Sequence, residues 1–473
     1  MVLLFGSAAL ILILARPAPD PAGDIADYYG TTETILRHGS LDLRASDIER
    51  LSVVLHPGYF SNPGYYIPGT DGNRYPFHFI AYPLLLVPVR IILELAHISP
   101  LHVFGVMNLL IFVGMLLFLL KRFTNSVPRK ELLVLLALTS PLLFFINWPG
   151  PDILVMSLVL AGLCYWLSEI PFTAAVIFSF ASWHSQPVAA LSVATLAYGF
   201  LNNKYLHHKI SFKNKIIWAL GVLIVLVLPY AYNLSMFGTV SPWLTETDQW
   251  TRLYGFGLQN LSVQKLFEQF FDLNIGVFWY APLLVLLGIG SLMQKMKTAI
   301  GAWVGGSLLV TLFAFQTNPA WHYGTAGFGP TRHALILIPF LIAALSLWGS
   351  TKPRFGALIG VVIVTQLYVL SINNYIFPLF TNTLFHSPLA AFVLDRWPSW
   401  YNPTPEIFTD RTNHDDPDHP ETAIYRDQTR CLKAYVLPRD IETVIDECGP
   451  FPERTSGSVF RSETDGFYVN YAK

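Results

Sequence analysis

The strongest constraint on the fold of this chain is a series of apolar runs, most of them roughly 15 to 23 residues long. An α-helix needs about 20 such residues to cross a hydrocarbon core of about 30 Å, and it satisfies its own backbone hydrogen bonds in lipid. Hydrophobic residues make up 53% of the 473 residues and charged ones only 13%. The runs predict an all-α polytopic membrane protein with about eleven transmembrane helices. They cover residues 2–15, 101–120, 131–147, 152–168, 171–186, 188–201, 216–233, 277–293, 299–316, 332–349 and 355–376.

Basic residues indicate which ends of the runs face the cytoplasm, because short cytoplasmic loops are enriched in Lys and Arg. The basic loops all fall on one side if a further run, 77–97, does not cross the membrane. That run contains Pro83, Pro88, Arg90 and Glu94, which favours a helix lying in the outer interface. The loops in question are 121–130, 204–215, 295–297 and 352–354.

The two sides of the membrane then differ in composition. Inside loops are short and basic, whereas outside loops are long and rich in Trp, Tyr, Asp, His and Pro. The first outer loop, 17–100, belongs to a transmembrane domain of residues 1–376, and the segment 377–473 lies outside. We therefore expect function on the outer face. The net charge of −1 provides no basic field of the kind that would indicate nucleic acid as a partner.

The C-terminal segment is polar and rich in Asp, Pro, Thr and Arg. Strand-like alternation at 436–444 and 460–469 predicts a small α+β unit there. Cys431 and Cys448 both lie in this segment, where the topology places an oxidising compartment, so we expect a disulfide between them. Unpaired surface thiols are the alternative.

Residues 23–29 directly follow the first helix and open a helical pattern. Asp24, Asp27 and Tyr28 share one helix face by i, i+3 and i+4 spacing. A carboxylate at a membrane surface can serve as general base for a hydroxyl or amine acceptor when burial and neighbouring groups adjust its pKa. The alternative is that Asp24 simply caps the helix that starts near Ile25.

Three further outer residues are candidates for substrate contact. Arg74 and His78 lead into the interfacial run and could face a phosphate at headgroup level, since guanidinium binds phosphate through a bidentate fork. Their alternative role is interfacial anchoring. Asp152 lies at the outer mouth of two helices, where it could equally be a helix cap.

The segment 321–333 is the last candidate. Its three glycines allow backbone amides to approach a ligand closely. Arg332 is the first residue of a predicted spanning helix and lies at its outer end. A cation in that position opposes the helix dipole, so it needs an anionic partner or ligand. Trp321 and His322 begin the same segment and are further substrate-binding candidates, as is Tyr28.

Several familiar site patterns are missing from the sequence. It has no Walker phosphate loop, no Cys or His spacing suited to tetrahedral zinc, and no Gly-x-Ser-x-Gly elbow. Acidic residues inside the apolar runs are also nearly absent, which weakens the hypothesis of a proton-coupled or ion-coupled transporter.

The arrangement resembles membrane glycosyltransferases of the C fold, above all bacterial relatives of protein O-mannosyltransferases and lipid A aminoarabinose transferases. The shared features are a first helix followed by a long outer loop that opens with Gly-Asp, an interfacial segment that begins with Tyr-Pro, and a late outer Gly-Pro-x-Arg. The stretches that carry the resemblance are 23–24, 28–43, 75–76, 78–88, 274–276, 280–282 and 328–332.

The resemblance implies a polyprenyl phosphate sugar donor, whose sugar passes with inversion to a glycan, lipid or protein acceptor. It implies that Asp24 is the catalytic base and that Asp152 helps hold acceptor or sugar. Arg74 and Arg332 would bind the donor phosphate, and His78 would orient either substrate. It further implies a bacterial cytoplasmic (inner) membrane protein whose active site faces the periplasm or exterior.

The sequence departs from the family pattern at Ile25, where a Glu usually follows Gly-Asp. Asp27 could replace that acid, so the division of labour between Asp24 and Asp27 stays open. No cofactor is firmly implied; a divalent metal is possible but is not predicted. The alternative function is a non-enzymatic transporter or flippase for lipid-linked sugars or polysaccharides, and a third is an inactive assembly subunit of the cell envelope.

Overall fold

The computed structural model shows a mostly helical chain, at 68%, in agreement with the predicted all-α membrane domain. It describes residues 1–473 except 20–23, 56–65, 123–129, 203–209, 241–256, 319–320, 323, 326, 349–352, 375–382, 416–419, 429, 453–465 and 472–473. Gly23 of the Gly-Asp pair and parts of three of the four basic loops used for the topology therefore lie outside the described residues.

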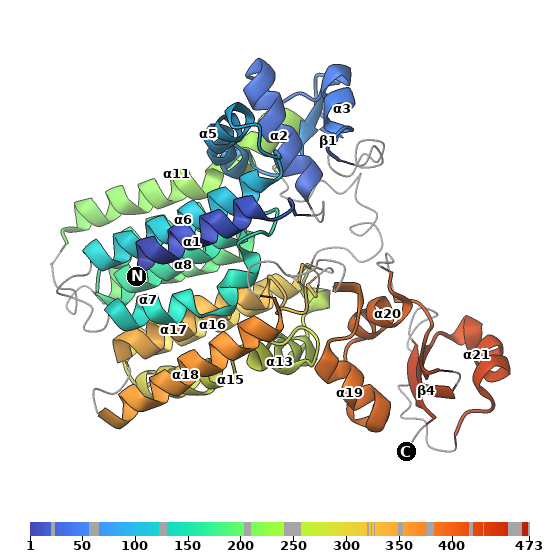
Figure 1. The fold of residues 1–473 in the computed structure, drawn as a ribbon. Coiled ribbons are helices and arrows are strands. Elements are labelled where there is room, and N and C mark those ends of the chain that lie inside the picture. The colour runs from blue at the N-terminus through green and yellow to red at the C-terminus, as the bar shows by residue number, and fades with distance from the viewer. Residues whose placement is uncertain are drawn as a thin grey trace.

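A bundle of apolar helices forms the body of the molecule, and its labelled members run side by side in Figure 1. Short 3-10 turns η1 (Pro141–Phe145), η2 (Gln186–Val188) and η5 (Ala334–Ile336) connect to it. The helices are α1 (Val2–Ala15), α6 (His102–Arg122), α7 (Lys130–Leu138), α8 (Asp152–Leu167), α9 (Pro171–Ala181), α10 (Ala189–Leu201), α11 (Phe212–Phe237), α15 (Pro282–Lys295), α16 (Ala299–Gln316), α17 (Leu337–Trp348) and α18 (Pro353–Ile372).

Three helices, α6, α11 and α16, are long and apolar enough to cross a membrane, and seven shorter apolar helices accompany them in the described part of the chain. The expected count of about eleven spans is therefore not confirmed. One reason is that several apolar runs are interrupted. The run 131–147, for example, divides at Pro141 into α7 and η1, because proline cannot donate the next helical hydrogen bond.

The segment after α1 folds against one end of the bundle, where Figure 1 shows α2, α3 and α5 together. Ion pairs hold α5 against α2, because Arg90 contacts Glu33 and Arg37 contacts Glu94 at 2.7 Å. The elements of this segment are α2 (Ile25–His38), α3 (Ala45–Leu51), the antiparallel strands β1 (Tyr66–Pro68) and β2 (Arg74–Pro76), and α5 (Ala81–Leu95).

The C-terminal segment contains helices and a three-stranded antiparallel sheet in the order β3-β4-β5, together with a disulfide between Cys431 and Cys448. Short elements of the preceding outer loop lie beside it. The elements are η4 (Leu258–Asn260), α13 (Val263–Phe271), α14 (Val277–Tyr280), α19 (Pro388–Arg396), η7 (Pro398–Trp400), α20 (Pro405–Asn413), β3 (Ala423–Asp427), β4 (Arg430–Val436), η8 (Pro438–Asp440), α21 (Ile441–Cys448) and β5 (Phe467–Asn470).

The predicted strand at 436–444 is wrong, because only Val436 belongs to a strand, β4, while η8 and α21 occupy 438–444. Ile441, Val444 and Cys448 recur at helical spacing and pack onto the sheet. The predicted strand at 460–469 is found only at its end, as β5, since 453–465 lies outside the described residues.

Buried polar hydrogen bonds attach the C-terminal segment to α13 and to Asn274, which follows it. Glu268 of α13 accepts hydrogen bonds from the backbone and the hydroxyl of Thr404, at 2.7 and 3.0 Å. Asn274 similarly accepts a bond from the backbone of Ser387 at 2.8 Å. Buried polar groups are costly to leave unpaired, so these bonds fix where α19 and α20 sit.

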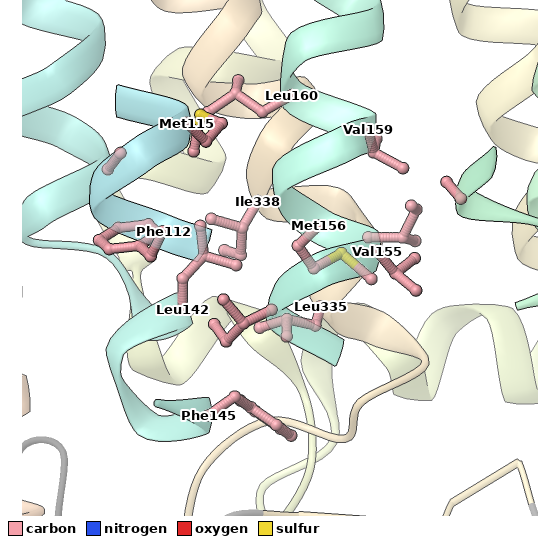
Figure 2. Packing of buried hydrophobic residues seen from close by; sticks show 14 of the residues in the cluster. Phe112, Met115, Leu142, Phe145, Val155, Met156, Val159, Leu160, Leu335 and Ile338 are labelled. Atoms are coloured by element: carbon pink, nitrogen blue, oxygen red, sulfur yellow. The ribbon is translucent and has the colours of Figure 1, made fainter. Parts of the chain in front are cut away.

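The core centres on α8, which lies between α6, η1 and the start of α17 in Figure 2. Phe112, Leu142 and Ile338 are fully or almost fully buried there. Gly162 brings α8 close to α9, because a Cβ at this position would lie 2.5 Å from the ring of Phe178. Small residues allow this close approach of helices in membranes.

We predict that Gly162→Ala destabilises the protein by about 1–3 kcal/mol, because the added methyl overlaps a fully buried ring. The matched control is Gly114→Ala in α6, where a Cβ meets nothing within 4 Å; alanine should be neutral or stabilising there. Thermal unfolding in detergent measures both. Equal midpoints for the two variants would contradict the packing described here.

Candidate functional site

Asp24 lies at the N-terminus of α2, yet its side chain makes no capping hydrogen bond. Its carboxylate instead accepts a hydrogen bond from Arg332, with Nη1 3.3 Å from Oδ2. The simple capping role considered above therefore does not describe Asp24. Burial acts to raise the pKa of Asp24, but His78 and Arg332 outweigh it and hold the pKa below its ordinary value.

Asp27 lies one helical turn further and is fully buried. Its Oδ2 accepts hydrogen bonds from the backbone N–H of His78 at 2.8 Å and from Nδ1 of the same residue at 2.7 Å. Because Nδ1 carries this proton, Nε2 is the atom of His78 turned toward Asp24, 3.9 Å from Oδ2. Asp27 thus orients the imidazole, and Asp24 is the acid beside its other nitrogen.

The imidazole of His78 lies between two carboxylates. Burial acts to lower the pKa of His78, but Asp24 and Asp27 outweigh that effect and raise the pKa above its ordinary value. The ring of Tyr28 packs against it, with centroids 4.9 Å apart. When it is protonated, His78 adds a second positive charge next to Arg332.

The segment 321–333 sets the position of Arg332. The backbone N–H of Arg332 donates to the carbonyl of Gly324 at 2.9 Å, and Thr325 pairs with Thr331 as an isolated bridge. Gly324 has φ +76, and a Cβ there would lie 2.6 Å from Cδ of Arg332. Only glycine suits both the backbone conformation and the space that the arginine side chain needs.

Trp321 and His322 begin this segment and do not line the cavity described below. Trp321 is fully buried against Ile275 and Ile407, and Nε2 of His322 lies 3.0 Å from Asp410 of α20. Both residues therefore connect the loop that carries Arg332 to the C-terminal segment. Their predicted contact with substrate finds no support in this placement.

A cavity of about 540 Å³ opens at the centre of these residues. Asp24, Tyr28 and His78 line it from the first outer loop, and Asp152 and Arg332 line it from the bundle. Arg74 is not among the lining residues; it lies on β2, with Nε 3.4 Å from the carbonyl of Tyr66. The structure thus brings together Asp24, Asp27, Tyr28, His78, Asp152 and Arg332, and leaves Arg74, Trp321 and His322 elsewhere.

Three buried polar atoms in the cavity wall have no hydrogen-bond partner within the described part of the chain. They are Oδ2 of Asp152, Nδ1 of His184 and Nε of Arg332. A buried polar atom left unpaired costs about 1–3 kcal/mol. A ligand or a water molecule that reached these atoms could accept hydrogen bonds from the nitrogens and donate one to the carboxylate oxygen.

Helix α11 forms one side of the cavity through Leu226, Val227 and Tyr230. Pro229 lies inside this helix and cannot donate to the carbonyl of Val225 four residues earlier. The indole of Trp183 donates to that carbonyl instead, at 2.7 Å. The proline and the tryptophan thus fix α11 to the turn after α9.

Neither His184 nor the α11 wall is among the candidates that the sequence predicts. Pro229 within an apolar run indicates a local break in the helix. It does not indicate which side chain donates a hydrogen bond to the carbonyl of Val225. Among the described residues, no group of three or more His, Cys, Asp or Glu side chains could hold a metal ion.

No family model, curated protein or solved structure matches the chain. The geometry of the cavity therefore has to carry the functional argument.

We predict a pH-dependent contribution of His78 to stability. Because its pKa is raised on folding, the contribution is fully present below its unfolded pKa of about 6.5 and is lost as the pH rises through the folded pKa. The melting temperature of wild type should exceed that of His78→Gln most at about pH 5.5, and the gap should narrow toward about pH 9. A gap that is constant or widens over this range would contradict the placement of His78 between two carboxylates.

Proposed function

We propose that this protein is a membrane glycosyltransferase of the C fold. It would pass a sugar, with inversion, from a polyprenyl phosphate donor to an acceptor at the outer face of a bacterial inner membrane. The observation that carries the proposal is the cavity in which Asp24, His78 and Arg332 meet with unpaired buried polar atoms. These groups would suit a reaction that has an anionic leaving group, a proton to be removed and a substrate with several hydroxyls.

The donor phosphate belongs at Arg332, next to His78. A guanidinium binds phosphate oxygens through parallel N–H bonds, and Nε of Arg332 is buried without a partner among the described residues. On donor binding, Arg332 exchanges the carboxylate of Asp24 for the phosphate. Loss of that ion pair raises the basicity of Asp24 at the point where the acceptor arrives.

In the transfer step, the acceptor oxygen or nitrogen attacks the anomeric carbon from the side opposite the phosphate. The new bond to the sugar forms as the bond between anomeric carbon and phosphate oxygen breaks. The electron pair leaves with the polyprenyl phosphate, whose developing charge Arg332 and His78 stabilise. Asp24 takes the proton of the acceptor.

The other two acids have supporting roles in this scheme. Asp27 holds His78 through two hydrogen bonds and is fully buried, so it positions the imidazole and is not the base. Oδ2 of Asp152 is an unpaired acceptor in the wall, suited to a hydroxyl of the sugar or of the acceptor.

The α11 wall favours a lipid-linked donor over a water-soluble one. Leu223, Ile224 and Val227 of this helix are 55%, 64% and 46% exposed, as expected of a helix that faces lipid. Val227 also lines the cavity. A polyprenyl chain could therefore leave the cavity along α11 without crossing a polar surface.

The test is transfer by the protein reconstituted in nanodiscs with farnesyl phosphate sugars and an envelope extract as acceptor source. We predict release of farnesyl phosphate by wild type and a loss of at least about 10²-fold in Asp24→Asn, with donor binding retained. The matched control is Asp71→Asn, which removes an exposed acid of the same outer loop and should transfer like wild type. Donor binding without turnover in wild type would favour the transporter or the assembly subunit.

A second prediction concerns Gly324. Both Gly324→Ala and Gly39→Ala place alanine at positive φ, +76 and +68, but only the first meets a neighbouring side chain, that of Arg332. Both should lose about 1 kcal/mol of stability, whereas only Gly324→Ala should weaken donor binding, by about tenfold or more. Equal donor affinities in the two variants would argue against Arg332 as the phosphate ligand.

A further inference from the structure

His184 occupies the turn between α9 and η2 and has one ring nitrogen committed. The backbone N–H of Tyr82 donates to Nε2 at 3.1 Å. Because a backbone N–H can only donate, Nε2 must be unprotonated, so the proton of a neutral ring sits on Nδ1. The fold therefore selects the Nδ1–H tautomer of His184.

That Nδ1–H group is buried and has no hydrogen-bond partner within the described chain, although His184 lines the cavity. An unpaired buried donor is costly, and a site that keeps one is prepared for an acceptor. Burial, together with His78, lowers the pKa of His184 to about 3. The ring therefore stays neutral over the physiological range.

The surroundings of His184 differ from those of Arg332. Rings of Tyr28, Phe79 and Tyr82 lie around it, with centroids 6.3, 6.4 and 6.1 Å away. Arg332 and protonated His78 already provide the positive charge that a phosphate needs. An uncharged N–H among aromatic rings instead suits an uncharged oxygen on a ligand with apolar C–H faces, as a sugar ring has.

We propose that Nδ1–H of His184 donates a hydrogen bond to an oxygen of the transferred sugar and so contributes to the choice of sugar. This proposal rests on the glycosyltransferase function proposed above. A purely structural role, in which His184 only accepts the bond from Tyr82, would leave sugar choice unchanged.

The first experiment determines the tautomer and does not depend on turnover. Protein labelled with ¹⁵N-histidine is compared with His184→Gln to assign the ring signals of His184, from about pH 5 to 8. We expect a neutral ring with the proton on Nδ1 throughout, and a shift of the Nδ1–H signal when farnesyl phosphate mannose, glucose or galactose binds. A proton on Nε2 would overturn the proposal.

The second experiment measures sugar choice with the same three donors and their monodeoxy analogues. Wild type should favour one parent sugar over one of its deoxy analogues by about tenfold in kcat/KM, the value of one neutral hydrogen bond. His184→Phe removes both nitrogens and should abolish this preference, whereas the amide of His184→Gln can accept and donate and should restore it. The same preference in wild type and His184→Phe would overturn the proposal.

The outcomes also separate this proposal from the function on which it rests. If wild type turns over the donors and the His184 variants keep its sugar preference, the glycosyltransferase proposal stands and the proposed role of His184 falls. If wild type neither binds nor uses any of these donors, both proposals fall. If His184→Phe does not fold, the ring spectrum of wild type still decides, because an Nδ1–H signal that a bound donor does not shift rejects sugar contact.

Discussion

An ion pair between Asp24 and Arg332 joins two of the segments that line the cavity. The residues are 308 positions apart, and Nη1 of the arginine lies 3.3 Å from the carboxylate. A guanidinium removed from bulk water needs a negative partner, because its desolvation is costly. Each side chain is still 28% exposed, so a ligand can reach the pair. A bound phosphate could take the place of the carboxylate, and this exchange would bind the donor and release the base in one step.

The support of this pair comes from elements that are distant in the sequence. Gly324 leaves room for the arginine side chain, and Trp321 fills the space beneath the loop. His322 connects the loop to Asp410 of α20, so the C-terminal segment forms part of the scaffold of the site. This arrangement resists the small displacements of a positively charged group that reduce its interaction with a developing negative charge.

Local patterns in the sequence predicted the apolar helices, the outer acids and Arg332, because hydropathy, helix spacing and loop charge are properties of neighbouring residues. They did not predict the division of the run 131–147 into two elements. Nor could residue type alone separate Arg332 from Arg74, since both are arginines in outer loops. The roles of His78 and His184 depend on contacts with residues 51 and 102 positions away, which no local pattern contains.

Phosphate binding at Arg332 can be observed directly in an electron cryomicroscopy structure of the protein in nanodiscs with bound farnesyl phosphate. We predict that the phosphate lies against Arg332 and His78, that Asp24 has separated from the arginine, and that the lipid chain follows α11. A phosphate bound elsewhere on the protein, with the pair between Asp24 and Arg332 intact, would contradict it.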